Sequence, residues 1–185
     1  MNKTTNKTLY IANAAVIAAL YVVLTALAAG FDLASGAIQV RFSECLTVMP
    51  FFTSAGIPGV TLGCLIANLV TGGALPDIIF GTLATLIGAL GTYALRKNRF
   101  LCTLPPVIAN AAIIPFVLKY AYGIDGSFDL LGIHFSTLPA CAITVGIGEI
   151  ITCVIFGQIL ITAILPVKKH LFEQKGESVK KSEKA

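Results

Sequence analysis

The stretch ECLTVMPFFTSAGIPGVTLGCLIANLVTGGAL, from Glu44 to Leu75, decides how many times this chain is expected to cross a membrane. As a single helix it would be much longer than one crossing requires. Its middle, Ser54–Gly59, holds two glycines and a proline, and this composition is a typical turn signal. The sequence therefore predicts two short spans on either side of a turn, Arg41–Thr53 and Pro58–Leu75.

The rest of the chain is as apolar as this stretch. Hydrophobic residues make up 56% of the sequence and charged residues 12%, which is too little charge for the surface of a water-soluble domain of 185 residues. A span needs about 20 apolar residues to cross about 30 Å of hydrocarbon. By this measure six spans are predicted: Leu9–Gly30, Arg41–Thr53, Pro58–Leu75, Asp77–Leu95, Leu104–Tyr122 and Thr137–Leu165.

The basic residues support an even number of spans. Eleven of the 13 Lys and Arg residues fall in three clusters, at Lys3 and Lys7, at Arg96–Arg99 and at Lys168–Lys184. Cytoplasmic loops carry an excess of Lys and Arg, and six spans place all three clusters on that side, whereas five would put Arg96–Arg99 outside. We therefore expect an all-α integral membrane protein with six transmembrane helices and both termini in the cytoplasm. The clusters are interpreted as topology signals and not as a nucleic-acid patch.

The domain organisation follows from these spans. Residues 1–8 form a cytoplasmic N-terminus, 9–166 the membrane domain, and 167–185 a basic tail that is expected to be disordered. The phosphate loop G-x-x-x-x-G-K-[ST] is absent, so ATP-driven work would need a partner. The five cysteines are odd in number and form no C-x-x-C pair, which argues against a disulfide framework. No metal site and no cofactor are predicted.

Polar side chains inside the spans are costly and point to function. Glu149 lies about 12 residues into the last span, roughly 18 Å at 1.5 Å per residue, near the membrane centre. Arg41, Glu44, Asn68 and Asp77 all map to the outer half of the bundle. Together they predict a pocket that opens to the outside and narrows toward Glu149. Its excess of acids suits a ligand that carries a cation or several N–H donors.

Simpler interpretations exist for these residues. Arg41 and Glu44 are three apart and could form an ion pair on one helix face, and Asp77 could cap the helix it starts. Asn68, and Asn110 in the inner half of the fifth span, could hydrogen-bond between helices, and Glu149 could do the same. Tyr120 and Tyr122 are expected in an aromatic belt at the outer boundary.

The first span carries small residues at helical spacing, in the pairs Ala14-x-x-x-Ala18 and Ala15-x-x-x-Ala19. Such a stripe lets two helices approach closely. It could serve internal packing, or it could be a docking face for another membrane subunit.

Four segments together resemble the QueT family of substrate-binding (S) subunits of energy-coupling factor (ECF) transporters. They are RFSECLT (41–47), DIIFGTLATL (77–86), LPPVIAN (104–110) and VGIGEI (145–150), and the similarity covers roughly Leu9 to Leu165. The resemblance implies an S-component-like bundle in a bacterial plasma membrane that captures a queuosine precursor from outside. This ligand would be a 7-deazaguanine base of the aminomethyl (preQ1) or cyano (preQ0) type.

The resemblance also implies partners and site residues. The partners are a transmembrane coupling subunit and two cytoplasmic ATPases, and the chain itself would not be an enzyme. The motif residues map onto Arg41, Glu44, Asp77, Asn110 and Glu149. A carboxylate can accept both N–H groups of a guanine-like edge, so Glu149 or Glu44 is expected there, with Asp77 on the amine.

Rival interpretations remain open at this point. The chain could be a stand-alone proton- or ion-coupled carrier with Glu149 and Asp77 as a relay, or an S subunit for a different vitamin. An intramembrane enzyme would have to use Cys141 with His134, the one nucleophile and base that come near each other in sequence.

Overall fold

The computed structural model describes residues 3–30, 41–124, 127–130 and 133–172, and these are almost entirely helical. The long helices are α1 (Lys3–Gly30), α2 (Gly56–Val70), α3 (Leu75–Ala94), α4 (Leu104–Tyr120) and α5 (Thr137–Glu149). The last of these continues without a break through a π-helical segment, η3 (Ile150–Phe156), into α6 (Gly157–Ile164). The shorter elements are the 3-10 helices η1 (Phe42–Phe51), η2 (Leu101–Thr103) and η4 (Leu165–Val167), the helix α7 (Lys168–Phe172), and the strands β1 (Phe128–Leu130) and β2 (Ile133–Phe135).

The predicted turn in the deciding stretch is present between η1 and α2. Gly56 begins α2 against the backbone of η1, where an added Cβ would lie 2.5 Å from the nitrogen of Pro50. No side chain fits so close an approach, which explains why the turn needs a glycine here. The chain thus reverses where the sequence predicted, and η1 and α2 are separate elements.

The segment before this turn, which was predicted as a short span over Arg41–Thr53, is too short to cross hydrocarbon as a straight helix. It is a ten-residue 3-10 helix, about 20 Å long at a rise of about 2.0 Å per residue, and hydrocarbon is about 30 Å thick. Four helices, Lys7–Gly30, Leu75–Ala94, Leu101–Tyr120 and Thr137–Val167, are long and apolar enough to cross a membrane, and Gly56–Val70 is a shorter apolar helix. The structure therefore supports a helical membrane protein with four full-length spans in the described part of the chain.

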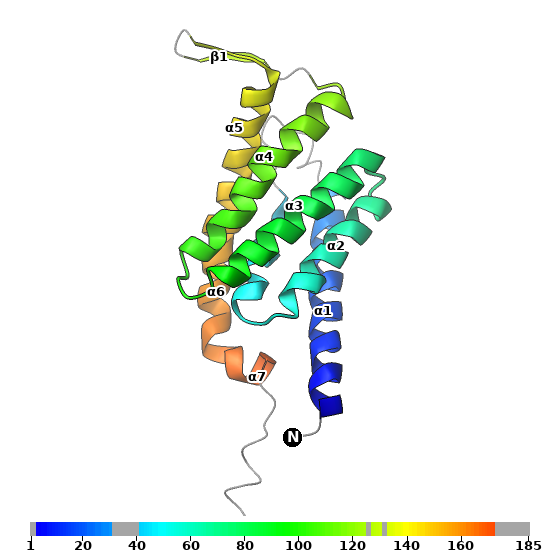
Figure 1. Cartoon of the computed structure of the whole chain (residues 1–185), viewed down its shortest axis with the longest axis vertical. Helices are drawn as coiled ribbons and strands as arrows, with labels where there is room; N and C mark the ends of the chain where they lie inside the picture. The colour runs from blue at the N-terminus through cyan, green and yellow to red at the C-terminus, as the bar shows by residue number, and fades with distance from the viewer. Residues whose placement is uncertain (1–2, 31–40, 125–126, 131–132, 173–185) are drawn as a thin grey trace, which may run out of the picture.

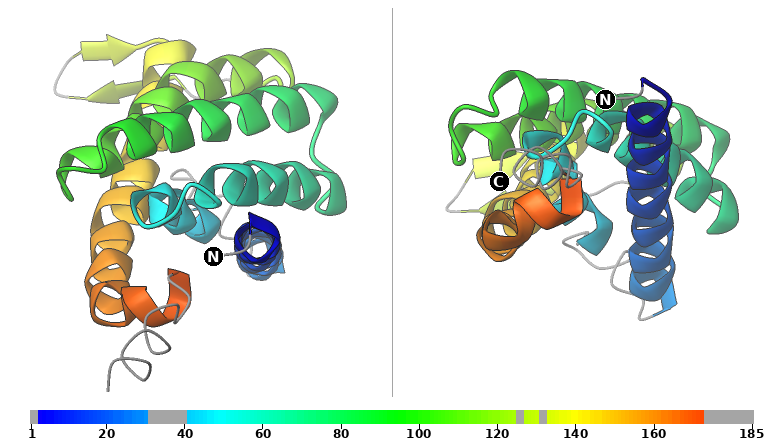
Figure 2. Two further views of the ribbon diagram at one scale, coloured as in Figure 1. Left: turned by 60° about the horizontal axis from the view of Figure 1, so that its bottom comes forward. Right: turned by 90° about the horizontal axis from the view of Figure 1, so that it is seen from below.

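The helices pack mainly on their neighbours in sequence, while η1 lies in the middle. Helix α1 packs on α2, α2 on α3, α3 on α4, and α4 on α5 (Figure 2). The short η1 contacts α1, α2, α3 and η3, so it is enclosed by the bundle. The beginning of α1 and the helix α7 lie at one end of the molecule, and the β1–β2 hairpin lies at the other (Figure 1).

The apolar side chains are distributed as lipid requires. A buried cluster surrounds η1 and includes Tyr21, Val48, Val60 and Ile161. Large hydrophobic side chains are also exposed along the outer faces of α1, α3 and α4, and Ile11 and Ile108 are more than half exposed. So large an exposed apolar surface is unfavourable in water but is favourable in contact with bilayer hydrocarbon.

The chain beyond the last long helix turns back toward the bundle. Pro166 lies within η4, and α7 follows it directly. The Phe172 ring of α7 stacks on Phe52 with centroids 5.8 Å apart. The remainder of the predicted tail, 173–185, lies outside the described residues.

Candidate functional site

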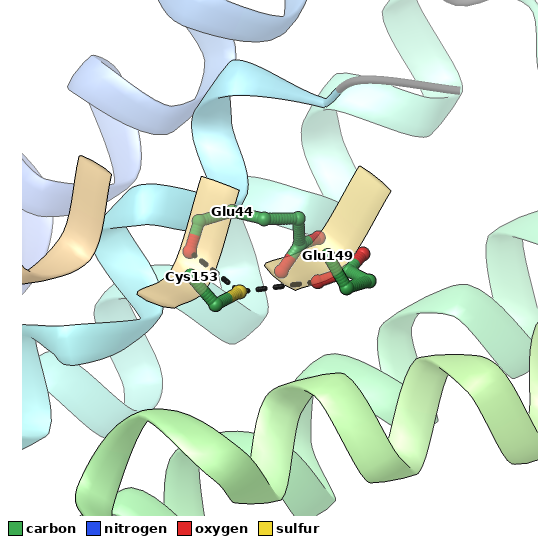
Figure 3. A group of neighbouring side chains, drawn as sticks. All are labelled: Glu44, Glu149 and Cys153. Carbon is green, nitrogen blue, oxygen red and sulfur yellow. Dashed lines mark hydrogen bonds between the residues drawn. The ribbon is translucent and has the colours of Figure 1, made fainter. Parts of the chain in front are cut away.

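The centre of the bundle contains two carboxylates and a thiol from elements far apart in sequence. Glu44 comes from η1, Glu149 from the end of α5, and Cys153 from η3 (Figure 3). All three are buried, and one ligand atom of each lies within 4.8 Å of the others. The Cys153 thiol donates to Glu149 Oε2 at 3.1 Å and lies 3.5 Å from the backbone oxygen of Glu44. The π-helical segment begins directly after Glu149, and such segments occur frequently at functional sites.

The two oxygens of the Glu44 carboxylate differ in their partners. The Tyr21 hydroxyl, from α1, donates to Oε1, and the Thr47 hydroxyl donates to the backbone oxygen of Glu44 at 2.6 Å. Among the described residues Oε2 has no hydrogen-bond partner, although Glu44 is fully buried. A buried polar atom left in this state costs about 1–3 kcal/mol. The site thus holds an acceptor that the protein does not satisfy.

A buried donor without a partner lies in the same region. Asn110 on α4 is 2% exposed and its side chain is next to Glu149. Its Nδ2 has no hydrogen-bond acceptor in the described part of the chain. The neighbourhood of Glu149 therefore contains an acceptor atom, Glu44 Oε2, and a donor atom, Asn110 Nδ2, that have no hydrogen-bond partner among the described residues.

Arg41 and Asp77 form a pair at the edge of the same region, where α3 begins. Arg41 precedes η1 in an extended conformation, and its Nη2 lies 3.3 Å from Asp77 Oδ2 in the first turn of α3. The Tyr122 hydroxyl also donates to Asp77 Oδ2 at 3.3 Å. The proposed ion pair between Arg41 and Glu44 is therefore wrong, because the Arg41 salt bridge goes to Asp77 and Glu44 is hydrogen-bonded to Tyr21.

Asn68 connects the neighbouring helices. Its Nδ2 donates to the backbone oxygen of Asp77 at 3.5 Å and lies 3.6 Å from Cys64 Sγ. The side chain thus joins α2 to α3, as the simpler of its two interpretations expected. This hydrogen bond helps to fix the backbone at Asp77.

A small cavity lies beside both Arg41 and Glu149. It is lined by Arg41, Ile114, Val145 and Glu149 and has a volume of about 10 Å³. That is about the space of one water molecule. A base-sized ligand can enter only if the residues around this cavity separate. Arg41 borders this cavity and is paired with Asp77.

The family model described as "QueT transporter" matches residues 11–166. The chain belongs to the QueT transporter family. The curated "Queuosine precursor transporter QueT" of Lactococcus lactis subsp. cremoris (strain MG1363) is 40% identical over 82 residues, which is 44% of this chain and 48% of that protein. The match thus spans about half the length of the curated relative. No solved structure matches the chain.

Membership of the QueT family confirms the resemblance that was drawn from the four segments. Both the family and the relative are described as transporters, which is consistent with a chain that is not an enzyme.

The alanine stripe of this QueT chain divides into two rows. Ala14 and Ala18 are buried against α2, where a Cβ added to Gly59 would lie 3.0 Å from Ala14 O and one added to Gly63 would lie 3.1 Å from Ala18 Cα. Ala15 and Ala19 are exposed. All four alanines line an apolar groove of about 700 Å³ between α1 and α2. Only the outward row is free to contact another protein without disturbing the bundle.

Sequence reasoning missed three residues of the site. Tyr21 and Glu44 are 23 positions apart and no pattern relates them. Tyr122 was placed in an aromatic belt, but its hydroxyl bonds to Asp77 and accepts from the backbone nitrogen of Ala74. Cys153 was interpreted as one of several inert thiols. Its spacing of four from Glu149 was the one available signal, since such residues share a helix face.

Proposed function

We propose that this chain is the S subunit of an ECF-type ABC importer. It captures a queuosine precursor, a 7-deazaguanine base, from outside a bacterial cell for ATP-driven uptake by partner subunits. Family membership and the description of the L. lactis relative support the transport role and this ligand class. The ECF coupling rests on the resemblance drawn from the sequence.

The unmatched buried atoms carry the ligand proposal. A guanine-like edge presents a carbonyl oxygen beside a ring N–H and an exocyclic amine. Glu149 accepts from the two N–H donors, and Asn110 Nδ2, which has no acceptor among the described residues, donates to the carbonyl. Hydrogen bonds to an ionised carboxylate are stronger and more directional than neutral ones, so this edge gives both affinity and orientation.

Six crossings with cytoplasmic termini remain part of this proposal. The short η1 and α2 act as the second and third spans. Irregular or short elements occur at membrane depth only where protein surrounds them, and η1 is enclosed by α1, α2, α3 and η3. The common end at which α1 begins and α7 lies is consistent with an even number of crossings (Figure 1).

The outward row, Ala15 and Ala19, is proposed as the contact with the transmembrane coupling subunit. Small side chains there leave an apolar groove into which a partner helix can fit closely. The loaded bundle then tips on that subunit, and ATP hydrolysis by two cytoplasmic ATPases resets the complex.

The direct test is calorimetric titration of the purified chain in detergent. The ligands are aminomethyl-deazaguanine, the cyano analogue, guanine, riboflavin and folate. We expect a deazaguanine to bind and Glu149→Gln to weaken that binding at least tenfold, because Gln has one acceptor oxygen and repels an N–H donor. Tyr120→Phe is the matched control, since Tyr120 is 72% exposed and away from the cavity.

Three outcomes would contradict the proposal. A folded sample that gives no heat with any base would reject the ligand class. Gradient-driven accumulation by liposomes that contain this chain alone would favour a self-sufficient carrier over an S subunit. Tight binding of riboflavin or folate instead would indicate an S subunit for a different vitamin.

A further inference from the structure

The charged groups of the candidate site do not balance. Three carboxylates, those of Glu44, Asp77 and Glu149, lie around a single guanidinium, that of Arg41. The pair of Arg41 and Asp77 is the one salt bridge within the described ranges, with 3.3 Å between Nη2 and Oδ2. The side-chain hydrogen-bond donors to the two glutamate carboxylates are a tyrosine hydroxyl and a thiol, which are neutral groups.

This imbalance is severe because the two glutamates are buried and close together. Glu44 is 0% and Glu149 6% exposed. Two carboxylates so close in a medium of low dielectric constant cannot both carry charge without a cation nearby. Glu44 Oε2 is also without a partner in the part of the chain that the structure describes. A positively charged hydrogen-bond donor bound here would satisfy both features at once.

We propose that the site binds its ligand as a cation and that Glu44 holds the positively charged group. This inference rests on the proposed function, in which the ligand is a 7-deazaguanine. Its cationic member is the aminomethyl base, whose primary ammonium donates to Glu44 Oε2. This replaces the expectation that Asp77 binds the amine, because Asp77 Oδ2 already accepts hydrogen bonds from Arg41 and Tyr122.

The shape of such a ligand fits the arrangement of the acids. In this base the aminomethyl group and the ring N–H flank the same carbonyl oxygen. The ligand thus presents two donors on either side of one acceptor. The protein offers two carboxylates, Glu44 and Glu149, that approach each other closely, and the unmatched amide nitrogen of Asn110. Glu149 therefore accepts hydrogen bonds from the N–H groups of the base, and Glu44 pairs with the ammonium group.

A metal ion is the competing cation, and the local bonding disfavours it. Cys153 acts as a thiol donor toward Glu149, and Tyr21 occupies Glu44 Oε1. Zinc sites use four protein ligands, or three with a water, and a cysteine binds zinc as a thiolate. Here the Cys153 proton is used in the hydrogen bond to Glu149, so zinc would have to break that bond. Calcium takes six to eight oxygen ligands, far more than this group supplies. An ammonium needs no such set, since hydrogen-bond acceptors suffice.

The test compares ligands that differ in charge at one position. Calorimetric titration of the full chain uses the aminomethyl base, the neutral hydroxymethyl base of nearly the same size, and the cyano base. For the unmodified protein we expect the aminomethyl base to bind at least tenfold more tightly than either neutral base. This comparison needs no variant, so it does not depend on whether a substitution folds.

Two variants then identify which carboxylate binds the ammonium group of the ligand. Glu44→Gln should reduce the preference for the amine to within about threefold while the cyano base still binds. Asp77→Asn should keep the preference, even if it weakens all three ligands. The thermal unfolding midpoint of each variant checks that it is folded.

The outcomes separate this inference from the proposed function. If the three bases bind equally well, the ligand charge is not recognised and the inference fails, although the deazaguanine site stands. Loss of the preference in Asp77→Asn but not in Glu44→Gln would return the amine to Asp77. If no base binds, the proposed function itself fails. Heat with zinc alone that disappears in Cys153→Ser would overturn the inference in favour of a metal site.

Discussion

At the scale of single residues, the site is built from side chains whose sequence signals differ greatly. The acids stand out because carboxylates are rare in apolar spans. Their roles depend on partners that the sequence does not indicate. Tyr21 donates a hydrogen bond to one oxygen of Glu44, and the other oxygen has no partner among the described residues. Arg41 forms its salt bridge with Asp77 and not with Glu44. The division of labour among the acids is therefore set by neighbours from other helices.

The hydroxyl of Tyr21 gives a prediction at this scale. Tyr21→Phe removes the donor to Glu44 Oε1, and that carboxylate then has two buried oxygens without partners. We expect a loss of stability of about 1–3 kcal/mol, the cost of leaving a buried polar group unsatisfied. The midpoint of thermal unfolding in detergent measures it. Tyr120→Phe is the control, because that ring is mostly exposed. Equal midpoints for both variants would show that the hydrogen bond to Glu44 contributes little.

At the scale of elements, the bundle is arranged around a short 3-10 helix, η1. Because η1 contacts α1, α2, α3 and η3, it carries Glu44 into the centre, where the end of α5 brings Glu149. A full-length span in place of η1 would need lipid contact along its sides. The short 3-10 helix instead buries Ser43, Glu44 and Thr47 among other helices. The candidate site exists because this element is enclosed.

The two alanine rows of α1 give a prediction at the element scale. Ala15→Leu with Ala19→Leu fills the outward side of the groove, so we expect normal folding and ligand binding but loss of association with the coupling subunit. Ala14→Leu with Ala18→Leu places bulk against Gly59 and Gly63 of α2, where the backbones are close, and should instead lower the unfolding midpoint.

Co-purification with a tagged ECF module and thermal unfolding distinguish these two effects. If the outward pair leaves the complex intact and uptake unchanged, α1 does not dock on the coupling subunit. If the inward pair leaves the midpoint unchanged, the close packing of α1 on α2 is not important for stability.

At the scale of the whole molecule, the proposed topology can be tested by labelling. Lys97 lies in the connection between α3 and α4, and Ile124 follows α4 at the other end of that helix. In whole cells a membrane-impermeant maleimide should label Ile124→Cys, and should label Lys97→Cys only after the cells are opened. The unsubstituted chain measures the background from its own five cysteines, of which four are buried. External labelling at Lys97→Cys would contradict six crossings with cytoplasmic termini.

The sequence by itself determined the class of the protein and predicted which residues form its candidate site. An apolar helical bundle is predicted by the apolar runs, the turn at Ser54–Gly59 and the basic clusters. Segments in contact with lipid must be apolar and helical, and basic residues gather in the cytoplasmic loops. The four segments identified the family, which the family model confirms. Glu44 and Glu149 could be recognised from the sequence because acidic residues are rare in apolar spans.

Only the tertiary structure decided what those residues touch. It shortened the second span to η1, paired Arg41 with Asp77 instead of Glu44, brought Tyr21 and Cys153 to the two glutamates, and divided the alanine stripe into two rows. Each of these facts depends on contacts between elements far apart in the chain. Local patterns record the preference of a residue for lipid, helix or turn, whereas the partner of a buried charge is chosen by how the helices pack.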